Sequence, residues 1–192
     1  MSDNETGGYA ISIELRKINR DRKEKRKCKR LYLTAFPDNE RAPFILLSYK
    51  ARRDSVDFLS VYAGDKWLGF FYVVRDEDLA YIFYFAISET ERGKGYGSAA
   101  LQALKEYYFS YRLFLASETL DDAAPNIAER VKRKNFYLNN GFEDLKTKVQ
   151  EGEVIYDILG VGGEVTNSEY QRLMFKWMGS FMSRRITTEM QQ

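Results

Sequence analysis

The chain has 192 residues, of which 44% are hydrophobic and 15% aromatic, so it can bury one substantial core and we expect a single domain over residues 1–192. It contains no histidine and a single cysteine, Cys28, which excludes Ser-His and Cys-His nucleophile pairs, His-ligated zinc and an internal disulfide framework. The net charge is only +2, but residues 16–30 hold ten Lys and Arg against Asp21 and Glu24, a local +8 that leaves about −6 elsewhere. We expect no bound metal, and proton transfer must use carboxylate, tyrosine, lysine or cysteine groups.

The first predicted elements lie in residues 9–52. Residues 9–15 alternate like a strand, and residues 18–35 carry Cys28, Leu31, Tyr32 and Ala35 at helical spacing. The charges of 16–30 are interpreted as the solvated face of this helix, with docking to RNA or another acidic partner as the alternative. A loop bracketed by prolines, residues 36–43, then leads into a short helix over 44–52.

A hairpin and a buried strand follow. Residues 57–62 and 67–74 are rich in β-formers on either side of a turn that contains Gly64, which predicts two antiparallel strands. Residues 79–87 are almost uninterrupted apolar residues, typical of a central strand that is buried on both faces. This strand runs into a glycine-rich loop.

The second half of the sequence predicts a helix over 98–111 and then a short buried strand over 113–116, beside the first central strand. A helix over 128–139 and closing strands at 142–145 and 154–159 follow. The core is thus about residues 9–162. A further helix over about 167–182 has a Thr166/Glu169 capping box and an apolar stripe made by Tyr170, Leu173, Met174, Trp177, Met178 and Phe181. The stripe is interpreted as covering the domain's own sheet, with a homodimer interface as the alternative.

The glycine-rich loop is the strongest chemical signal. It reads Arg92-Gly93-Lys94-Gly95-Tyr96-Gly97-Ser98, between a buried strand and a helix, so that backbone amides can approach a ligand closely. The positive end of the following helix and the side chains of Arg92 and Lys94 favour a pyrophosphate there. The spacing is neither that of the dinucleotide fingerprint nor that of the P-loop. A kinase loop is excluded because it needs a catalytic histidine segment.

Together with later residues, this loop resembles that of the GNAT superfamily of N-acetyltransferases. The family's cofactor motif is Q/R-x-x-G-x-G/A, which Arg92, Gly95 and Gly97 match. Tyr137 to Phe142 matches the family's Y-x-x-x-G-F ending, and the resemblance covers roughly residues 10–160. It implies an α/β (α+β) fold: a mixed, mostly antiparallel central sheet of six to seven strands flanked by helices, with a splayed parallel pair at the centre.

The resemblance also implies a cofactor and its site. Acetyl-CoA would be the co-substrate, with its pantetheine arm along the main chain of Phe85, Ala86 and Ile87 and its pyrophosphate on the loop amides of residues 92–98. Asn126 lies where the family often has an asparagine that bonds the pantetheine, but Arg130 occupies the commoner position, and helix capping by Asn126 is an equal alternative. The splayed strands, ending here at Ile87 and Ala116, would open a cleft for the acetyl group.

Family members transfer the acetyl group directly to an amine, so Cys28 is not needed as a nucleophile and is interpreted as a packing residue. Tyr137 stands where the family usually carries the tyrosine that protonates the departing CoA thiolate. For the base we expect Glu118, just after the short strand, ahead of Glu40, Glu89 and Glu91.

The predicted function is an N-acetyltransferase for a primary amine. The carboxylates of Glu118, Asp121 and Asp122 favour a cationic acceptor, such as a polyamine, aminoglycoside, amino acid or protein terminus. No apolar run approaches the roughly 18–20 residues that span a bilayer and residues 1–8 are polar, so we expect no membrane partner and a cytoplasmic location. Two alternatives remain: an acyl-CoA-binding sensor without activity, and a nucleic-acid-docking module that uses residues 16–30.

Overall fold

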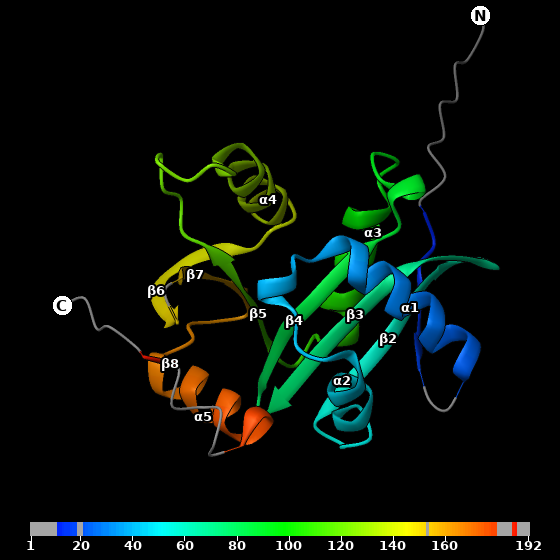
Figure 1. Ribbon diagram of the computed structural model, residues 1–192, viewed down its shortest axis with the longest axis horizontal. Helices are drawn as coiled ribbons and strands as arrows, with labels where there is room; N and C mark the ends of the chain where they lie inside the picture. Colours follow the sequence, from blue (N-terminus) through cyan, green and yellow to red (C-terminus); the bar gives the residue numbers. More distant parts are fainter. Residues whose placement is uncertain (1–10, 19–20, 153, 180–185, 188–192) are drawn as a thin grey trace, which may run out of the picture.

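The computed structural model describes residues 11–18, 21–152, 154–179 and 186–187, and Figure 1 shows their arrangement. In these residues a single mixed sheet has the strand order β1-β2-β3-β4-β5-β7-β6-β8. The strands are β1 (Glu14–Lys17), β2 (Val56–Ala63), β3 (Lys66–Asp76), β4 (Leu79–Ile87), β5 (Arg112–Glu118), β6 (Glu143–Glu151), β7 (Val154–Val161) and β8 (Ile186–Thr187).

Helices cover both faces of the sheet. They are α1 (Arg22–Ala35), α2 (Phe44–Lys50), α3 (Tyr96–Tyr107), α4 (Ile127–Asn139) and α5 (Asn167–Met178), with short 3₁₀ turns η1 (Asp38–Glu40) and η2 (Glu89–Glu91). Buried residues of α1, α2 and α5 form one core with the sheet, and those of α3, with Phe136 and Tyr137 of α4, pack into a second core on the other face. Among the described residues, no helix is long and apolar enough to cross a membrane.

The expected fold class is confirmed. Every pair of neighbouring strands in the order above is antiparallel except β4 and β5, which run parallel at the centre. The seven expected strands are present, and β8 is a two-residue addition at the β6 edge. Thr166 and Glu169 form the expected capping box.

The predicted first strand begins later than expected. Residues 9 and 10 lie outside the described part, and residues 11–13 are in no strand. The pairing explains why: Glu14 lies opposite Tyr62, and β2 ends one residue later at Ala63, where the turn to β3 begins. In this register Ile13 comes opposite Ala63, the last residue of β2, and residues before Ile13 run past the end of their partner strand.

The apolar stripe of α5 covers the chain's own sheet. Tyr170, Leu173, Met174 and Trp177 are buried, and the ring of Trp177 lies 4.3 Å from that of Phe83 on β4. Phe181 lies outside the described residues. The interpretation of the stripe as sheet-covering is confirmed for these four residues, and the homodimer stays a prediction.

The structure also agrees with the interpretation of the charged segment, residues 16–30, as the solvated face of a helix. On α1 the Lys and Arg side chains are exposed or partly exposed, while Cys28, Leu31 and Tyr32 are buried against the sheet. Asp21 caps the helix by accepting hydrogen bonds from the amides of Lys23 and Glu24.

Candidate active site

The pocket begins where the two parallel strands part. β4 and β5 pair only at Leu79, Ala80 and Tyr81, opposite Arg112, Leu113 and Phe114. Beyond Tyr81 the strands diverge, as Figure 1 shows, and a pocket of about 740 Å³ lies in the opening. This volume is in the range of sites that bind small molecules and cofactors.

One edge of β4 is available to a ligand along this opening. A bulge in the β3–β4 register leaves Phe83 without a cross-strand partner, so that Phe83 and Tyr84 both pack toward the same core. Phe85, Ala86 and Ile87, the expected pantetheine strand, all line the pocket. The other edge of β4 is held tightly by β3: a Cβ added at Gly69 would lie only 2.0 Å from the carbonyl oxygen of Ala86.

The glycine loop closes one end of the pocket. Gly93 and Gly95 have φ angles of +75° and +81°, which side-chain-bearing residues rarely adopt. Gly95 is the N-cap of α3 and gives its first amides no side-chain acceptor. The first amide N–H groups of a helix have no intrahelical acceptor, and a bound anion would supply one here.

The cations of the loop are arranged around it. Arg92 donates from Nε to the carbonyl oxygen of Ile87 at 3.1 Å, which ties the loop to the end of β4. Lys94 Nζ lies 3.2 Å from a carboxylate oxygen of Glu91, which also pairs with Lys66 at 2.6 Å. The pKa of Glu91 is lowered, chiefly by its bond from Lys66. Gly97 packs against α4, since a Cβ there would lie 3.2 Å from Cζ of Phe136.

Tyr137 lies where α4 faces the pocket. Its ring packs 5.3 Å from that of Phe136 and 5.8 Å from that of Phe142, and it lines the cavity with Phe136. Burial raises the pKa of Tyr137 to about 12, with Arg133 acting in the opposite direction. The phenol therefore keeps its proton at neutral pH.

Glu118 ends β5 inside the pocket and is held by two cations. Only 8% of its side chain is exposed, and it pairs with Arg130 at 2.8 Å and with Arg133 at 3.4 Å. Both arginines come from α4, so they fix this carboxylate across the opening from β4. These two guanidinium partners engage both of its oxygens.

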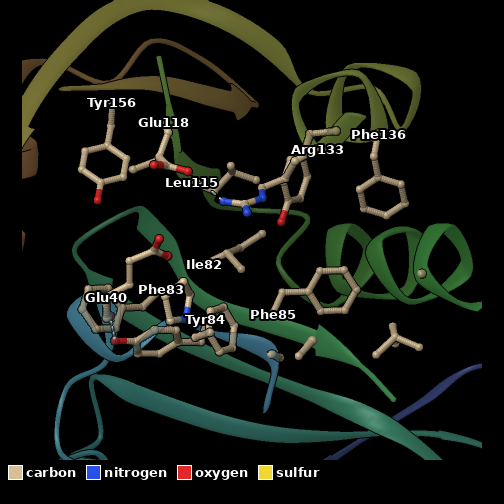
Figure 2. Close-up of a pocket in the computed structure, with 18 of the residues that line it drawn as sticks. Glu40, Ile82, Phe83, Tyr84, Phe85, Leu115, Glu118, Arg133, Phe136 and Tyr156 are labelled. Carbon is tan, nitrogen blue, oxygen red and sulfur yellow. Dashed lines mark hydrogen bonds and ion pairs between the residues drawn. The ribbon is translucent and has the colours of Figure 1, made fainter. Parts of the chain in front are cut away.

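Two further carboxylates, Glu40 and Glu151, face the same end of the pocket. In Figure 2, Glu40 lies below the cavity with its carboxylate directed toward Glu118 and Tyr156 on the opposite side. Burial raises the pKa of Glu40, and the charge of Glu118 raises it further. Glu151, at the end of β6, accepts a hydrogen bond from the phenol of Tyr170, and burial raises its pKa.

Aromatic rings surround these carboxylates. The pocket is lined there by Phe36, Tyr81, Phe83, Tyr84 and Tyr156. The pKa of the Tyr156 phenol is raised by burial and then by the charge of Glu151. Carboxylates among aromatic faces form a setting that attracts organic cations.

Several residues named in the sequence analysis do not line the pocket: Glu89, Glu91, Lys94, Tyr96, Asp121, Asp122, Asn126 and Cys28. Asn126 is the N-cap residue of α4, but its side chain makes no capping bond; its Oδ1 accepts from Nε of Arg130 at 2.9 Å, and it does not line the pocket. Cys28 is fully buried on α1, 4.0 Å from Oγ of Ser60, and burial raises its pKa to about 12. The thiol is in a packing position.

Sequence reasoning missed part of the pocket end that holds the carboxylates. Glu151 and Tyr156 lie on either side of the β6–β7 turn, where the Gln150-Glu151-Gly152 run is typical of an exposed hairpin. Arg133 occurs in a charged helix with no pattern to separate it from its neighbours. Only the fold brings these residues beside Glu118, because β7 pairs with β5 and places Tyr156 opposite Glu118.

Comparisons with known proteins agree with this geometry. The model of the acetyltransferase (GNAT) family matches residues 43–131. A search of the curated proteins found no match. Among solved structures, the chain is similar to a protein from Bacteroides thetaiotaomicron assigned to the GNAT family of acetyltransferases, with 18% identity over 88% of this chain and 98% of that one and a TM-score of 0.69.

Two other solved structures are similar at a TM-score between 0.5 and 0.6. One is an aminoglycoside 6'-N-acetyltransferase complexed with coenzyme A, with 10% identity over 79% of this chain and 99% of that one and a TM-score of 0.59. The other comprises mutant forms of a spermidine/spermine N-acetyltransferase from Vibrio cholerae, with 15% identity, coverage of 84% and 99% and a TM-score of 0.58.

Proposed function

We propose that the chain, whose residues 43–131 match the model of the GNAT acetyltransferase family, transfers the acetyl group of acetyl-CoA to a primary amine that is a cation in solution. The observation that carries this proposal is one continuous pocket with two chemically different ends. The uncapped α3 helix and its glycine loop lie at one end, and the carboxylates of Glu40, Glu118 and Glu151 lie at the other. The domain is proposed to act in the cytoplasm, as expected from the sequence.

The residues present fit a CoA thioester. Nothing lies within 4 Å of a Cβ added at Gly93, so the loop leaves room for a pyrophosphate against the amides that begin α3. The free edge of β4 at residues 85–87 then offers main-chain groups to the pantetheine arm, which would be aligned as an added strand. The similarity to an enzyme complexed with coenzyme A supports this assignment.

The acceptor end fits an amine with positive charge. Three carboxylates face two arginines, Arg130 and Arg133, so this end keeps a net negative charge. Two structural neighbours are named for an aminoglycoside and for spermidine/spermine, which supports acceptors of this class. We propose a polyamine or an aminoglycoside-like amine as the first acceptors to examine.

In the proposed reaction the protein positions both substrates and manages protons. The diverging strands hold the thioester carbon near the acceptor nitrogen, whose lone pair forms the new C–N bond as the C–S bond breaks. Tyr137, which keeps its proton at neutral pH, gives it to the departing sulfur and is reprotonated from the nitrogen.

The test is calorimetric titration with acetyl-CoA, followed by an assay of thiol release with spermidine, kanamycin, L-lysine and a peptide with a free N-terminus. Gly95→Glu places a carboxylate in the loop at a φ of +81° and should abolish binding. Gly64→Glu makes the same change at a φ of +57° in the β2–β3 turn, outside the pocket, and should bind normally. No binding by folded wild type would contradict the proposal, and binding without turnover would favour the sensor.

A further inference from the structure

We propose that Glu40 is the group that takes the proton from the acceptor's ammonium, an inference that rests on the proposed acetyltransferase function. From the sequence alone, Glu118 is the expected base. The contacts of the three pocket carboxylates separate them: Glu118 and Glu151 are engaged by other side chains, whereas Glu40 is engaged by none of the described ones.

The backbone around Glu40 is held firmly. Its carbonyl oxygen accepts a hydrogen bond from the phenol of Tyr84 at 3.0 Å, and the Tyr84 oxygen in turn accepts from the amide of Ala42 at 3.2 Å. The phenol of Tyr32 donates to the carbonyl oxygen of Ala42 at 2.9 Å. Turn η1 is thereby fixed to β4 and α1, so the Glu40 side chain enters the pocket from a defined position.

The Glu40 carboxylate itself has no hydrogen-bond or ion-pair partner within the described parts of the chain, although it is about half buried and lines the pocket. Glu118 by contrast pairs with Arg130 and Arg133. A general base must offer a free lone pair to the incoming group, and a carboxylate that is already engaged by guanidinium groups does so poorly. Figure 2 shows Glu40 directed into the cavity toward Glu118.

The surroundings make Glu40 a stronger base than an exposed glutamate. The groups that face it come from every neighbouring element: Glu118 of β5, Arg130 and Arg133 of α4, Glu151 of β6, Tyr84 of β4 and Tyr156 of β7. Burial and the Glu118 charge raise the pKa of Glu40, and the two arginines lower it. The net direction is upward, which favours proton uptake from an ammonium.

The proton balance of the reaction is then complete. The ammonium gives one proton to Glu40, and the freed lone pair attacks the thioester carbonyl carbon. The C–S bond breaks, and the sulfur leaves with the electron pair and takes the proton of Tyr137. The phenol recovers a proton from the nitrogen as the amide forms, and Glu40 releases its proton to solvent. One ammonium and one thioester give one amide, one thiol and one proton.

The experiment compares wild type with Glu40→Gln in a profile of kcat/KM against pH from 6 to 10.5, using the acceptor from the panel above that wild type turns over fastest. At pH 7 the variant should lose about 100-fold in kcat/KM. The loss should shrink toward pH 10.5, because about half of an amine with a pKa near 10.4 is by then neutral and needs no base. Acetyl-CoA affinity should be unchanged.

Two further variants serve as controls for the pH profile of Glu40→Gln. Glu143→Gln removes an exposed carboxylate outside the pocket and should follow wild type. Glu151→Gln removes the other pocket carboxylate with a raised pKa and should show a loss that is constant with pH, as expected for acceptor binding. Thermal melts establish that each variant is folded.

The outcomes separate the two proposals. A pH-dependent loss in Glu40→Gln alone supports the inference. Turnover by wild type together with a loss in Glu40→Gln that is absent or equal at every pH overturns the role of Glu40 and leaves the acetyltransferase intact. Wild type that neither binds acetyl-CoA nor releases thiol overturns both.

Discussion

Tyr137 is the residue whose chemistry can be isolated most cleanly. Its phenol is packed between Phe136 and Phe142, and its pKa of about 12 keeps the phenol protonated at neutral pH, as the proposed transfer to the leaving sulfur requires. Tyr137→Phe keeps the ring and removes only the proton, so we expect kcat to fall about 100-fold with little change in acetyl-CoA affinity. Steady-state kinetics and calorimetry measure the two quantities.

The matched control is Tyr107→Phe, which removes an exposed phenol on α3 outside the pocket. It should leave both kcat and affinity at the wild-type values. Unchanged kcat in Tyr137→Phe would show that the tyrosine only packs α4 onto the sheet.

At the residue scale, the sequence predicted the groups that a local motif carries. Gly93, Gly95 and Gly97 stand at alternate positions within one short segment, so the loop could be recognised from spacing alone. Glu40, Glu118 and Glu151 come from three separate segments and meet only because β4 and β5 diverge and β7 pairs with β5. A single sequence has no signal for such a meeting, and it could not tell a carboxylate paired with arginine from a free one.

At the element scale, the start of α5 joins a cap to an ion pair. One carboxylate oxygen of Glu169 accepts from the amide and the hydroxyl of Thr166, both at 2.9 Å, and the other accepts from Arg112 at 2.7 Å. The bond from Arg112 is the main reason that the pKa of Glu169 falls to about 2. This carboxylate ties α5 to β5.

We expect Glu169→Gln to lower the free energy of unfolding by about 1–2 kcal/mol at pH 7. The folded pKa lies below the ordinary value of 4.5, so the stabilisation is complete above pH 4.5 and is lost as the pH falls toward 2. At pH 3 the difference between wild type and variant should therefore be less than about half of its value at pH 7. Urea unfolding at the two pH values measures it.

Glu164→Gln is the control for this charge change, because the exposed Glu164 lies just before the helix and contributes only its carbonyl oxygen to Arg112. Glu164→Gln should change the free energy of unfolding very little at either pH. A Glu169→Gln defect that does not vary between pH 7 and pH 3 would contradict an electrostatic role for Glu169.

The bounds of elements with a strong local sequence pattern were predicted closely. The bounds of strands that end where their partner strands end were not. The apolar run of β4 was placed at Leu79–Ile87, and the capping box placed the start of α5. β6 was expected over 142–145 but runs to Glu151, because its residues after Lys146 alternate less clearly and are held by pairing with β7. Pairing partners, absent from the local pattern, decide such boundaries.

At the scale of the whole molecule, the sheet is clamped at one end and open at the other. At the clamped end β4 pairs with β5, and α5 packs across both strands through Tyr170, whose ring contacts Tyr81 and Phe114. Arg172 of α5 pairs with Asp76 at the end of β3, and Arg112 of β5 pairs with Asp78. At the open end the pocket separates β4 and α3 from β5 and α4.

A ligand that fills the open end would therefore connect the two halves, and its binding energy should appear in the stability of the whole chain. At acetyl-CoA concentrations 100 times the Kd, the unfolding free energy should rise by about 2.7 kcal/mol. For a chain of this size that raises Tm by roughly 5–10 °C. Thermal melts with and without acetyl-CoA measure the shift, which Gly64→Glu should retain and Gly95→Glu should lose. A shift retained in Gly95→Glu would place the bound ligand away from the α3 loop, and the two halves would then be joined by contacts other than those of the proposed pyrophosphate site.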